Sequence, residues 1–495
     1  MAKIRISRFL QQFALTTVIS LLTTVTMIFI TKFLARGLGP EEFGAYSLAR
    51  RMISNIAPLL ILSTEVALSR FIAMSKDPKT QSAYLLAAII ITGSAGLLFL
   101  AGALGGGRTF TSFVFGSPKY EALYKASLVL LEGYVLAVLV YSSLLGRQAI
   151  KAANAFQFLV MGLLPLSVAY FFATPKNLSL LVLLMGLAFY VSVGPIVFLL
   201  GKCGFPSWAV LKTSIKDVFT YSLPRVPAGF FLAGILTIGP FLAGKLMGLK
   251  ESGFFVVGQS ILRIMESFIV AFGLIALPKI SQWISEGKEE YLQLKIKDLL
   301  ALIFHLGLFL TIQTFIWSKE IILIWLGPEY MGIVPVMKII LLSLAPYIAY
   351  VFLRSIVDAV DVRAINMLNL FFSLLVTMAA SLGLYYAGAG ILGLALGTTI
   401  GFVALGLLTT RYLYRRYHFP LNDFRVLLVA GLNVLFAGAA LLAKPFLTAS
   451  SSQIGLLGTA LALEILFFAG YIFVLYQSKT PWLLELRKRV VMESS

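Results

Sequence analysis

Apolar residues dominate this chain in fourteen long runs, which short polar segments separate. Each run is roughly 20 residues or longer, the length that an α-helix needs to cross the hydrocarbon core of a bilayer at about 1.5 Å per residue. The pattern predicts an all-α integral membrane protein with about 14 transmembrane helices. The runs lie at 9–35, 43–73, 82–104, 121–146, 155–173, 178–200, 217–246, 252–277, 298–317, 334–357, 365–387, 389–410, 424–443 and 455–476.

The composition supports a membrane location. Of the 495 residues, 59% are hydrophobic and only 12% are charged, with a mean hydropathy of +0.95. No soluble core of this size needs such a composition. The first run follows Lys3, Arg5 and Arg8 in the manner of a signal peptide. It is too long for a signal core, however, and no small-residue cleavage site follows, so we interpret it as the first transmembrane helix.

The positive charges predict the orientation in the membrane. The formal net charge is +19, but most Lys and Arg residues fall in the short segments on the side of the N-terminus, and not in a nucleic-acid-binding patch. Cytoplasmic loops carry such an excess. We therefore expect a multi-pass protein of the cytoplasmic (inner) membrane with both termini in the cytoplasm and no nucleic-acid partner.

Several kinds of chemistry are disfavoured by what the chain lacks. A single cysteine, Cys203, cannot form an intramolecular disulfide, and two histidines, His305 and His418, make a zinc or iron site improbable. No segment matches the Walker pattern G-x-x-x-x-G-K-[ST], so ATP hydrolysis on this chain is improbable. We expect no enzyme, no metal and no cofactor.

An internal repeat divides the chain. The segment "LGPEEFGAY" (38–46) aligns with "MGLKESGFF" (247–255), "FGSPKY" (115–120) with "LGPEY" (326–330), and "KAAN" (151–154) with "RAIN" (363–366). The three matches keep their order and fall at equivalent helix ends, which predicts two parallel six-helix lobes related by an axis along the membrane normal. We expect an N-terminal lobe at 1–202, a cytoplasmic linker at 203–216, a C-terminal lobe at 217–411, helices 13 and 14 at 424–477 and a cytoplasmic tail at 478–495.

Two adjacent arginines, Arg50 and Arg51, lie inside the second run. They fall roughly 12–14 Å below the start of the helix, near the middle of the hydrocarbon core. Ser47, Ser54 and Asn55 share a helical stripe with them. A lipid-facing arginine at this depth costs several kcal/mol, so the stripe must face protein or water. We predict that these five residues bind substrate.

The second half carries a counterpart. Helix 8 contains Gln259, Arg263 and Glu266, and the repeat maps Arg50 onto Gln259. Arg225 lies just inside the start of helix 7. Arginines from both halves would build a cationic cavity suited to phosphate, because a guanidinium is always charged and donates two parallel hydrogen bonds. Alternatively, Arg263 and Glu266, three residues apart, neutralise each other.

Other polar or small residues have competing interpretations. Glu132 in helix 4 and Glu464 in helix 14 are isolated acids, which are candidates for ion coupling together with Glu266 or are protonated in place. Gly393, Gly397 and Gly401 recur every four residues in helix 12, which predicts a close-packing face for a neighbouring helix.

The segments "LARGLGPEEFGAYSLA" and "IWLGPEYMGIVPVMKII" resemble signatures of the polysaccharide flippases of the multidrug/oligosaccharidyl-lipid/polysaccharide (MOP) superfamily. The resemblance extends over the whole chain, and the predicted helices agree with the MATE-like fold of that superfamily. It implies translocation of a polyprenyl-diphosphate-linked oligosaccharide from the cytoplasmic to the outer leaflet by alternating access. It also implies an arginine-lined cavity, which maps onto Arg50, Arg51 and Arg263, and membrane lipid and polysaccharide polymerase or glycosyltransferase machinery as partners.

Three other functions stay open. A lipid II flippase would share the fold and the cavity arginines. A drug or cation exporter of the same superfamily would need acids to dominate the cavity. A membrane glycosyltransferase or polymerase would require a sizeable outer loop with catalytic residues, which this chain lacks.

Overall fold

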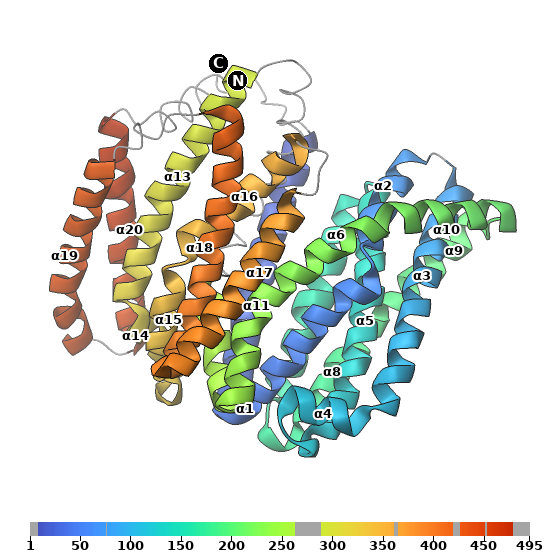
Figure 1. The fold of residues 1–495 in the computed structure, drawn as a ribbon, viewed down its shortest axis with the longest axis horizontal. Coiled ribbons are helices and arrows are strands. Elements are labelled where there is room, and N and C mark those ends of the chain that lie inside the picture. Colours follow the sequence, from blue (N-terminus) through green and yellow to red (C-terminus); the bar gives the residue numbers. More distant parts are fainter. Residues whose placement is uncertain are drawn as a thin grey trace. The chain divides into compact units, whose positions relative to one another are not determined.

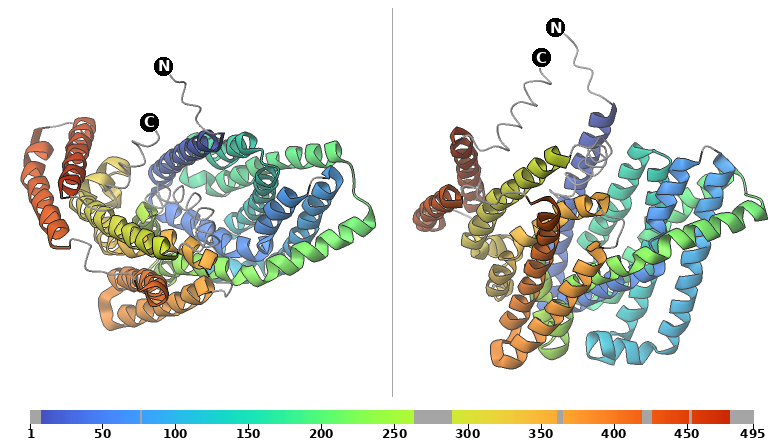
Figure 2. Two further views of the ribbon diagram at one scale, coloured as in Figure 1. Left: turned by 90° about the horizontal axis from the view of Figure 1, so that it is seen from above. Right: turned by 45° about the horizontal axis from the view of Figure 1, so that its top comes forward.

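The computed structural model describes residues 8–75, 77–262, 289–360, 365–418, 426–450 and 453–478. These residues form helices and short turns, without any strand (Figures 1 and 2). The chain divides into two compact units, Met1–Val257 with Tyr385–Leu394, and Gly258–Leu384 with Ala395–Ser495. The lobe boundaries of the sequence analysis remain a prediction.

The first unit contains eleven numbered helices and a helical segment at 249–262, which continues into the second unit. Within the unit, α2, α9 and α10 gather at one end, whereas α4 lies at the other (Figure 1). The helices are α1 (Arg8–Ile61), α2 (Thr64–Met74), α3 (Pro78–Gly105), α4 (Gly107–Phe115), α5 (Glu121–Gly146), α6 (Ile150–Gln157), α7 (Leu164–Phe172), α8 (Leu178–Phe189), α9 (Val193–Cys203), α10 (Trp208–Ser222) and α11 (Val226–Leu246), with the short turns η1 (Pro118–Tyr120), η2 (Phe158–Leu163), η3 (Pro175–Asn177), η4 (Tyr190–Ser192) and η5 (Leu223–Arg225).

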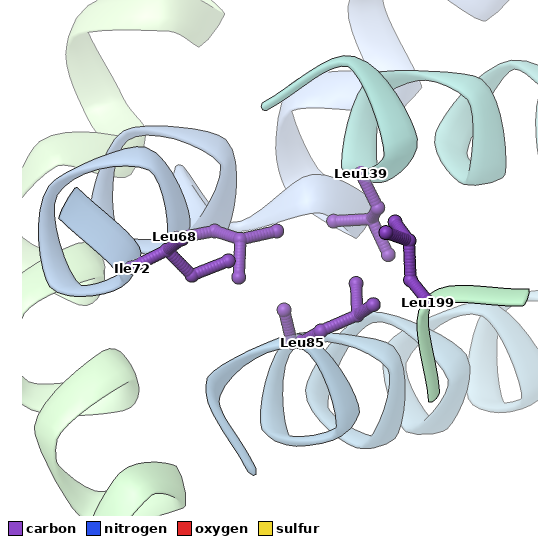
Figure 3. Packing of buried hydrophobic residues seen from close by; sticks show 6 residues of the cluster. Leu68, Ile72, Leu85, Leu139 and Leu199 are labelled. Atoms are coloured by element: carbon purple, nitrogen blue, oxygen red, sulfur yellow. The ribbon is translucent and has the colours of Figure 1, made fainter. Parts of the chain in front are cut away.

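Apolar side chains hold α2 in the first unit. Leu68 and Ile72 of α2 point into a buried cluster with Leu85 of α3, Leu139 of α5 and Leu199 of α9 (Figure 3). A second cluster on the neighbouring face joins α2 and α3 to α10 through Ala67, Ala87, Ile91, Leu211 and Val218. Between helices in a membrane, van der Waals packing of such side chains stabilises the contact. The two clusters therefore hold α2 against α3, α5 and α10.

The second unit is built from the remaining helices, and the C-terminal pair α19 and α20 falls where helices 13 and 14 are expected. Phe309 of α13 packs against Tyr471 of α20, with ring centroids 4.9 Å apart. The elements are α13 (Glu289–Ile316), α14 (Ser318–Trp325), η6 (Pro328–Tyr330), α15 (Ile333–Leu341), α16 (Leu344–Val360), α17 (Ile365–Leu384), η7 (Tyr385–Ala389), α18 (Gly390–Tyr417), α19 (Val426–Ser450) and α20 (Gln453–Gln477), of which η7 and the start of α18 belong to the first unit.

The described residues include ten helices that are long and apolar enough to span a membrane, or eleven if the bent pair Ile333–Leu341 and Leu344–Arg354 is one span. The sequence predicts fourteen. The numbers differ because some predicted spans run on as one helix. The first span and most of the second, 43–73, are joined at Gly39 in α1, and the second ends in α2. Ile365–Tyr417 contains two more predicted spans. The predicted span 252–277 is helical to residue 262, and its remainder lies outside the described residues.

The aligned glycines of the repeat all have a positive φ. Gly39 and Gly248 have φ of +75° and +131°, and Gly116 and Gly327 have φ of +75° and +107°. L-residues rarely adopt such angles, so these positions favour glycine. Gly116 and Gly327 each precede a short 3₁₀ turn, η1 and η6. The two halves therefore share a glycine with positive φ at equivalent positions.

Glycine also lets two repeat-equivalent helices touch in the first unit. A Cβ on Gly44 would overlap the carbonyl oxygen of Leu249, and a Cβ on Gly253 would lie 3.0 Å from the carbonyl oxygen of Pro40 and 3.1 Å from Cα of Gly44. The two helices thus meet backbone to backbone at equivalent glycines.

The predicted small-residue face in the second unit is confirmed for two of its glycines. A Cβ on Gly397 would overlap Ser381, and one on Gly401 would overlap Thr377, both in α17. Small residues at this spacing let α18 approach α17 closely.

Candidate functional site

Arg50 and Arg51 lie in α1, about 16 Å along the helix axis from the turn at Gly39. Arg51 is buried, with 4% of its surface exposed, and Arg50 is half-buried. A charged side chain in this position is costly unless polar groups surround it. The first unit thus encloses two permanent positive charges deep in a membrane-spanning helix.

Tyrosines surround the guanidinium of Arg50. Its Nη1 donates to Oη of Tyr46, one turn earlier, at 3.4 Å. Tyr134 of α5 is close enough to act electrostatically on the same guanidinium. Oη of Tyr46 in turn donates to Sδ of Met185 in α8, at 3.9 Å. No carboxylate of the described residues is within ion-pair distance of Arg50, so its charge stays available for an anionic ligand.

The other members of the predicted stripe differ in what they can offer a ligand. The hydroxyl of Ser54 donates to the carbonyl of Arg50 at 2.9 Å, and Nδ2 of Asn55 donates to the carbonyl of Arg51 at 3.0 Å. The Ser54 hydroxyl and the Asn55 amide thus donate to backbone carbonyls of α1 and not to a ligand. Ser47 is buried, and its hydroxyl has no hydrogen-bond partner within the described part of the chain.

The predicted residues of helix 8 are only partly described. Gln259 is fully buried and belongs to the second unit. Arg263 and Glu266 lie outside the described residues. Their contribution to a cavity, and the alternative ion pair between them, therefore remain predictions.

Arg225 is not brought to Arg50. It ends the turn η5 before α11, is exposed, and folds back onto α10. There Nη1 donates to the carbonyl of Tyr221 at 2.5 Å, and the guanidinium carbon lies 3.8 Å from the centroid of the Tyr221 ring. The expectation that Arg225 shares the site of Arg50 is not met, because the proline-rich start of α11 places it at a helix end.

The two isolated acids occupy different environments. The Glu132 carboxylate of α5 packs on the bare backbone of Gly96 in α3, where a Cβ would lie 2.8 Å from Oε2. Its Oε1 is buried and has no hydrogen-bond partner among the described residues. In the second unit, Glu464 accepts a hydrogen bond from Nε1 of Trp317 at 2.7 Å. This contact gives Glu464 a structural role in joining α20 to α13 and α14.

Two features of the structure were not predicted from the sequence: the tyrosines beside Arg50, and the contact of Arg70 with Tyr221. Tyr46 lies four residues before Arg50, a spacing that places both on one face of α1. Arg70 of α2 donates to Oη of Tyr221 at 3.1 Å. No pattern in the sequence connects positions 70 and 221, which only the packing of α2 against α10 brings together.

Comparison with known proteins agrees with this architecture. A family model described as "Polysaccharide biosynthesis protein" matches residues 9–284. Among curated proteins, no sequence match is found.

Solved structures provide matches to the fold. The lipid II flippase MurJ in an inward closed conformation superposes with a TM-score of 0.75 at 12% identity, covering 94% of this chain and 99% of that one. An inward-facing multidrug resistance MATE family transporter of the MOP superfamily superposes with a TM-score of 0.69 at 14% identity, covering 81% of this chain and 98% of that one. The Vibrio cholerae MATE transporter VcmN in its bent form superposes with a TM-score of 0.58 at 14% identity, covering 84% of this chain and 98% of that one. At these identities the matches establish the MOP fold alone.

Proposed function

Because this chain belongs to the polysaccharide biosynthesis protein family and has the MOP fold, we propose that it is a flippase. Its substrate is a polyprenyl-diphosphate-linked oligosaccharide, which it moves from the cytoplasmic to the outer leaflet for assembly of a surface polysaccharide. This chain supplies binding and a path across the bilayer, not a covalent reaction. Polysaccharide polymerase or glycosyltransferase machinery would supply or consume the substrate.

The Arg50–Arg51 pair carries this proposal. Two guanidiniums in the hydrophobic part of one unit, one half-buried and one buried, suit the two phosphates of a diphosphate. The surrounding low dielectric strengthens this attraction relative to water. The half-buried Tyr134 ring near Arg50 offers a flat surface on which a sugar ring can pack, whereas Tyr46 is buried and serves as the hydrogen-bond partner of Arg50.

The proposed mechanism is alternating access. The substrate diphosphate binds Arg50 and Arg51 while its polyprenyl tail stays in the bilayer. The two lobes then rock about this site and expose it to each side in turn, as in other transporters built from repeats. Since the chain has no Walker sequence, an ion gradient, the membrane potential or removal of product outside would drive net movement.

Two related functions are distinguished by the ligand. MurJ is described as a lipid II flippase, and lipid II transport is the first alternative. Drug or cation export is the second, but cations in the site would meet the positive charges of Arg50 and Arg51. A glycosyltransferase or polymerase is disfavoured because the chain has no long loop for a catalytic site.

A reconstitution experiment tests the function. We expect proteoliposomes with this protein, but not protein-free liposomes, to make inner-leaflet polyprenyl-diphosphate-linked oligosaccharide accessible to an added membrane-impermeant lectin. The assay is run with and without a proton gradient and a membrane potential. Transport of lipid II or of a lipophilic cation, without transport of the oligosaccharide, would assign the protein to the corresponding alternative.

The proposed orientation places both termini in the cytoplasm. Lys79 begins α3 just beyond the end of α2, whereas Lys176 lies in η3, near Ala173, which packs against Gly37 by the Gly39 turn. We expect single cysteines at these two exposed positions, in a Cys203→Ser background, to label from opposite sides: Lys176→Cys from outside and Lys79→Cys only after permeabilisation. The reverse pattern would contradict the N-in orientation.

A further inference from the structure

Two arginines, distant in sequence from each other, meet on one aromatic ring of the first unit. The guanidinium carbon of Arg70 in α2 lies 4.8 Å from the centroid of the Tyr221 ring in α10, and that of Arg225 in η5 lies 3.8 Å from it. Both arginines are exposed. Because both are held against the same ring, one diphosphate group can bridge them.

The ring is held firmly. Phe71 packs edge-on against Tyr221 with centroids 5.6 Å apart, and stacks on Tyr84 at 5.0 Å. Oη of Tyr84 donates to Oδ2 of Asp217 at 3.3 Å, which ties α3 to α10. At the end of α10, the Ser222 hydroxyl donates to the carbonyl of Ser63 at 3.2 Å. Since Tyr221 is fixed in this way, the two guanidiniums on it are positioned in advance of ligand binding.

The positive charge at this ring is not neutralised locally. Within the described part of the chain, no carboxylate lies within ion-pair distance of Arg70 or Arg225. The nearest acid on α10, Asp217, accepts its hydrogen bond from Tyr84, and the neighbouring Lys216 is exposed. Two guanidiniums on one ring, without a carboxylate to neutralise them, favour a ligand with two negative charges.

The surroundings place this ring at the level of lipid headgroups. On and just before α10, Phe205 and Trp208 are each 73% exposed and Phe219 is 45% exposed, next to the exposed lysines Lys212 and Lys216. Exposed aromatic and basic residues together are typical of the membrane–water interface. Arg70 lies in α2, beyond the break at Leu62 and Ser63 that follows the helix of Arg50, and Arg50 contacts Tyr46 instead. The ring is therefore a separate site from Arg50.

We propose that Arg70 and Arg225, held on Tyr221, form a binding site for the diphosphate of the lipid-linked substrate, which receives it at the cytoplasmic surface before it reaches Arg50. This inference rests on the flippase function and orientation proposed above. The site captures the headgroup where the phosphates of a membrane lipid naturally lie. The substrate then exchanges one pair of arginines for another as it enters the protein.

Binding in nanodiscs tests this site. The probe is a polyprenyl diphosphate without sugar, added to the purified full chain in phosphatidylcholine nanodiscs, with its affinity measured by microscale thermophoresis. All variants are compared in an Arg50→Gln/Arg51→Gln background, so that the deeper site does not bind the probe. We expect Arg70→Gln/Arg225→Gln to bind it about tenfold more weakly or worse, because two charge-assisted contacts are lost. The matched control Lys212→Gln/Lys216→Gln also removes two positive charges, but from α10, and leaves both arginines on Tyr221 in place. Its affinity for the probe should equal that of the protein without these two changes.

A further variant and a lipid competition distinguish the possible results. Arg70→Lys/Arg225→Lys keeps both charges and should restore part of the affinity, which guards against a folding defect in the Gln variant. Unchanged affinity in the Gln variant would overturn this site and leave the flippase function intact. Complete competition by phosphatidylglycerol would also overturn it, because bulk anionic lipid would then occupy the ring. Failure of the unchanged protein to bind any polyprenyl diphosphate would reject the proposed function as well.

Discussion

Replacing Arg50 by Gln is expected to reduce translocation of the lipid-linked oligosaccharide by about 100-fold or more. The guanidinium has Tyr46 as its hydrogen-bond partner and no described carboxylate within ion-pair distance, so its charge is free for the diphosphate. Loss of hydrogen bonds to a charged ligand costs about 1.5–3 kcal/mol each, and a bidentate arginine makes two. Insertion into the membrane should be unaffected, because removal of a deep charge lowers the cost of burial. The measurement is the lectin-accessibility assay in proteoliposomes, at equal reconstituted protein.

Companion variants separate binding from general electrostatics. Arg51→Gln should be similarly inactive, and Arg50→Lys should retain part of the activity, because an ammonium keeps the charge but loses the bidentate geometry. Arg108→Gln is the control, since it removes one positive charge from a side chain that is 87% exposed. Transport at the level of this control in both Arg50→Gln and Arg51→Gln would remove the pair from the substrate site.

Replacing Gly44 by Ala is expected to destabilise the protein strongly. The new Cβ would overlap the carbonyl oxygen of Leu249, which is backbone and cannot rotate away as a side chain would. The two helices would have to separate, and overpacking of this kind costs about 1–3 kcal/mol or more. We expect a clear drop in the thermal unfolding temperature in detergent, and lower abundance in the membrane. Gly253→Ala should act in the same direction, because its Cβ would crowd Pro40 and Gly44.

Gly93→Ala is the matched control for this contact. Gly93 also lies within a membrane-spanning helix, α3, but no atom lies within 4 Å of its added Cβ. The unfolding temperature of Gly93→Ala should therefore equal or exceed that of the unchanged protein, since alanine in a helix interior is more stable than glycine by about 0.8–1.0 kcal/mol. If Gly44→Ala is as stable as Gly93→Ala, the close approach of the two helices is not needed for the fold.

Local patterns in the sequence predicted the class of the fold and the position of the arginine pair. The length of an apolar run follows directly from bilayer thickness, so membrane helices are readable without any tertiary contact. Gly39 and Gly248 could be aligned from sequence because a tight turn demands glycine in both halves. Ser47, Arg50, Arg51 and Ser54 could be grouped because helical periodicity puts them on one stripe.

What the sequence could not determine was contact between residues far apart along the chain. Periodicity placed Arg225 near the start of a helix, but only packing revealed that its guanidinium lies on Tyr221 with Arg70, and not beside Arg50. The sequence predicted Glu464 as an isolated acid, but the packing of α20 places its carboxylate in hydrogen-bond contact with Trp317. The sequence by itself determined the membrane-spanning helices and the glycine turns, which depend on neighbours within one or two turns. The tertiary structure alone decided which charges meet, because that depends on how separate helices pack.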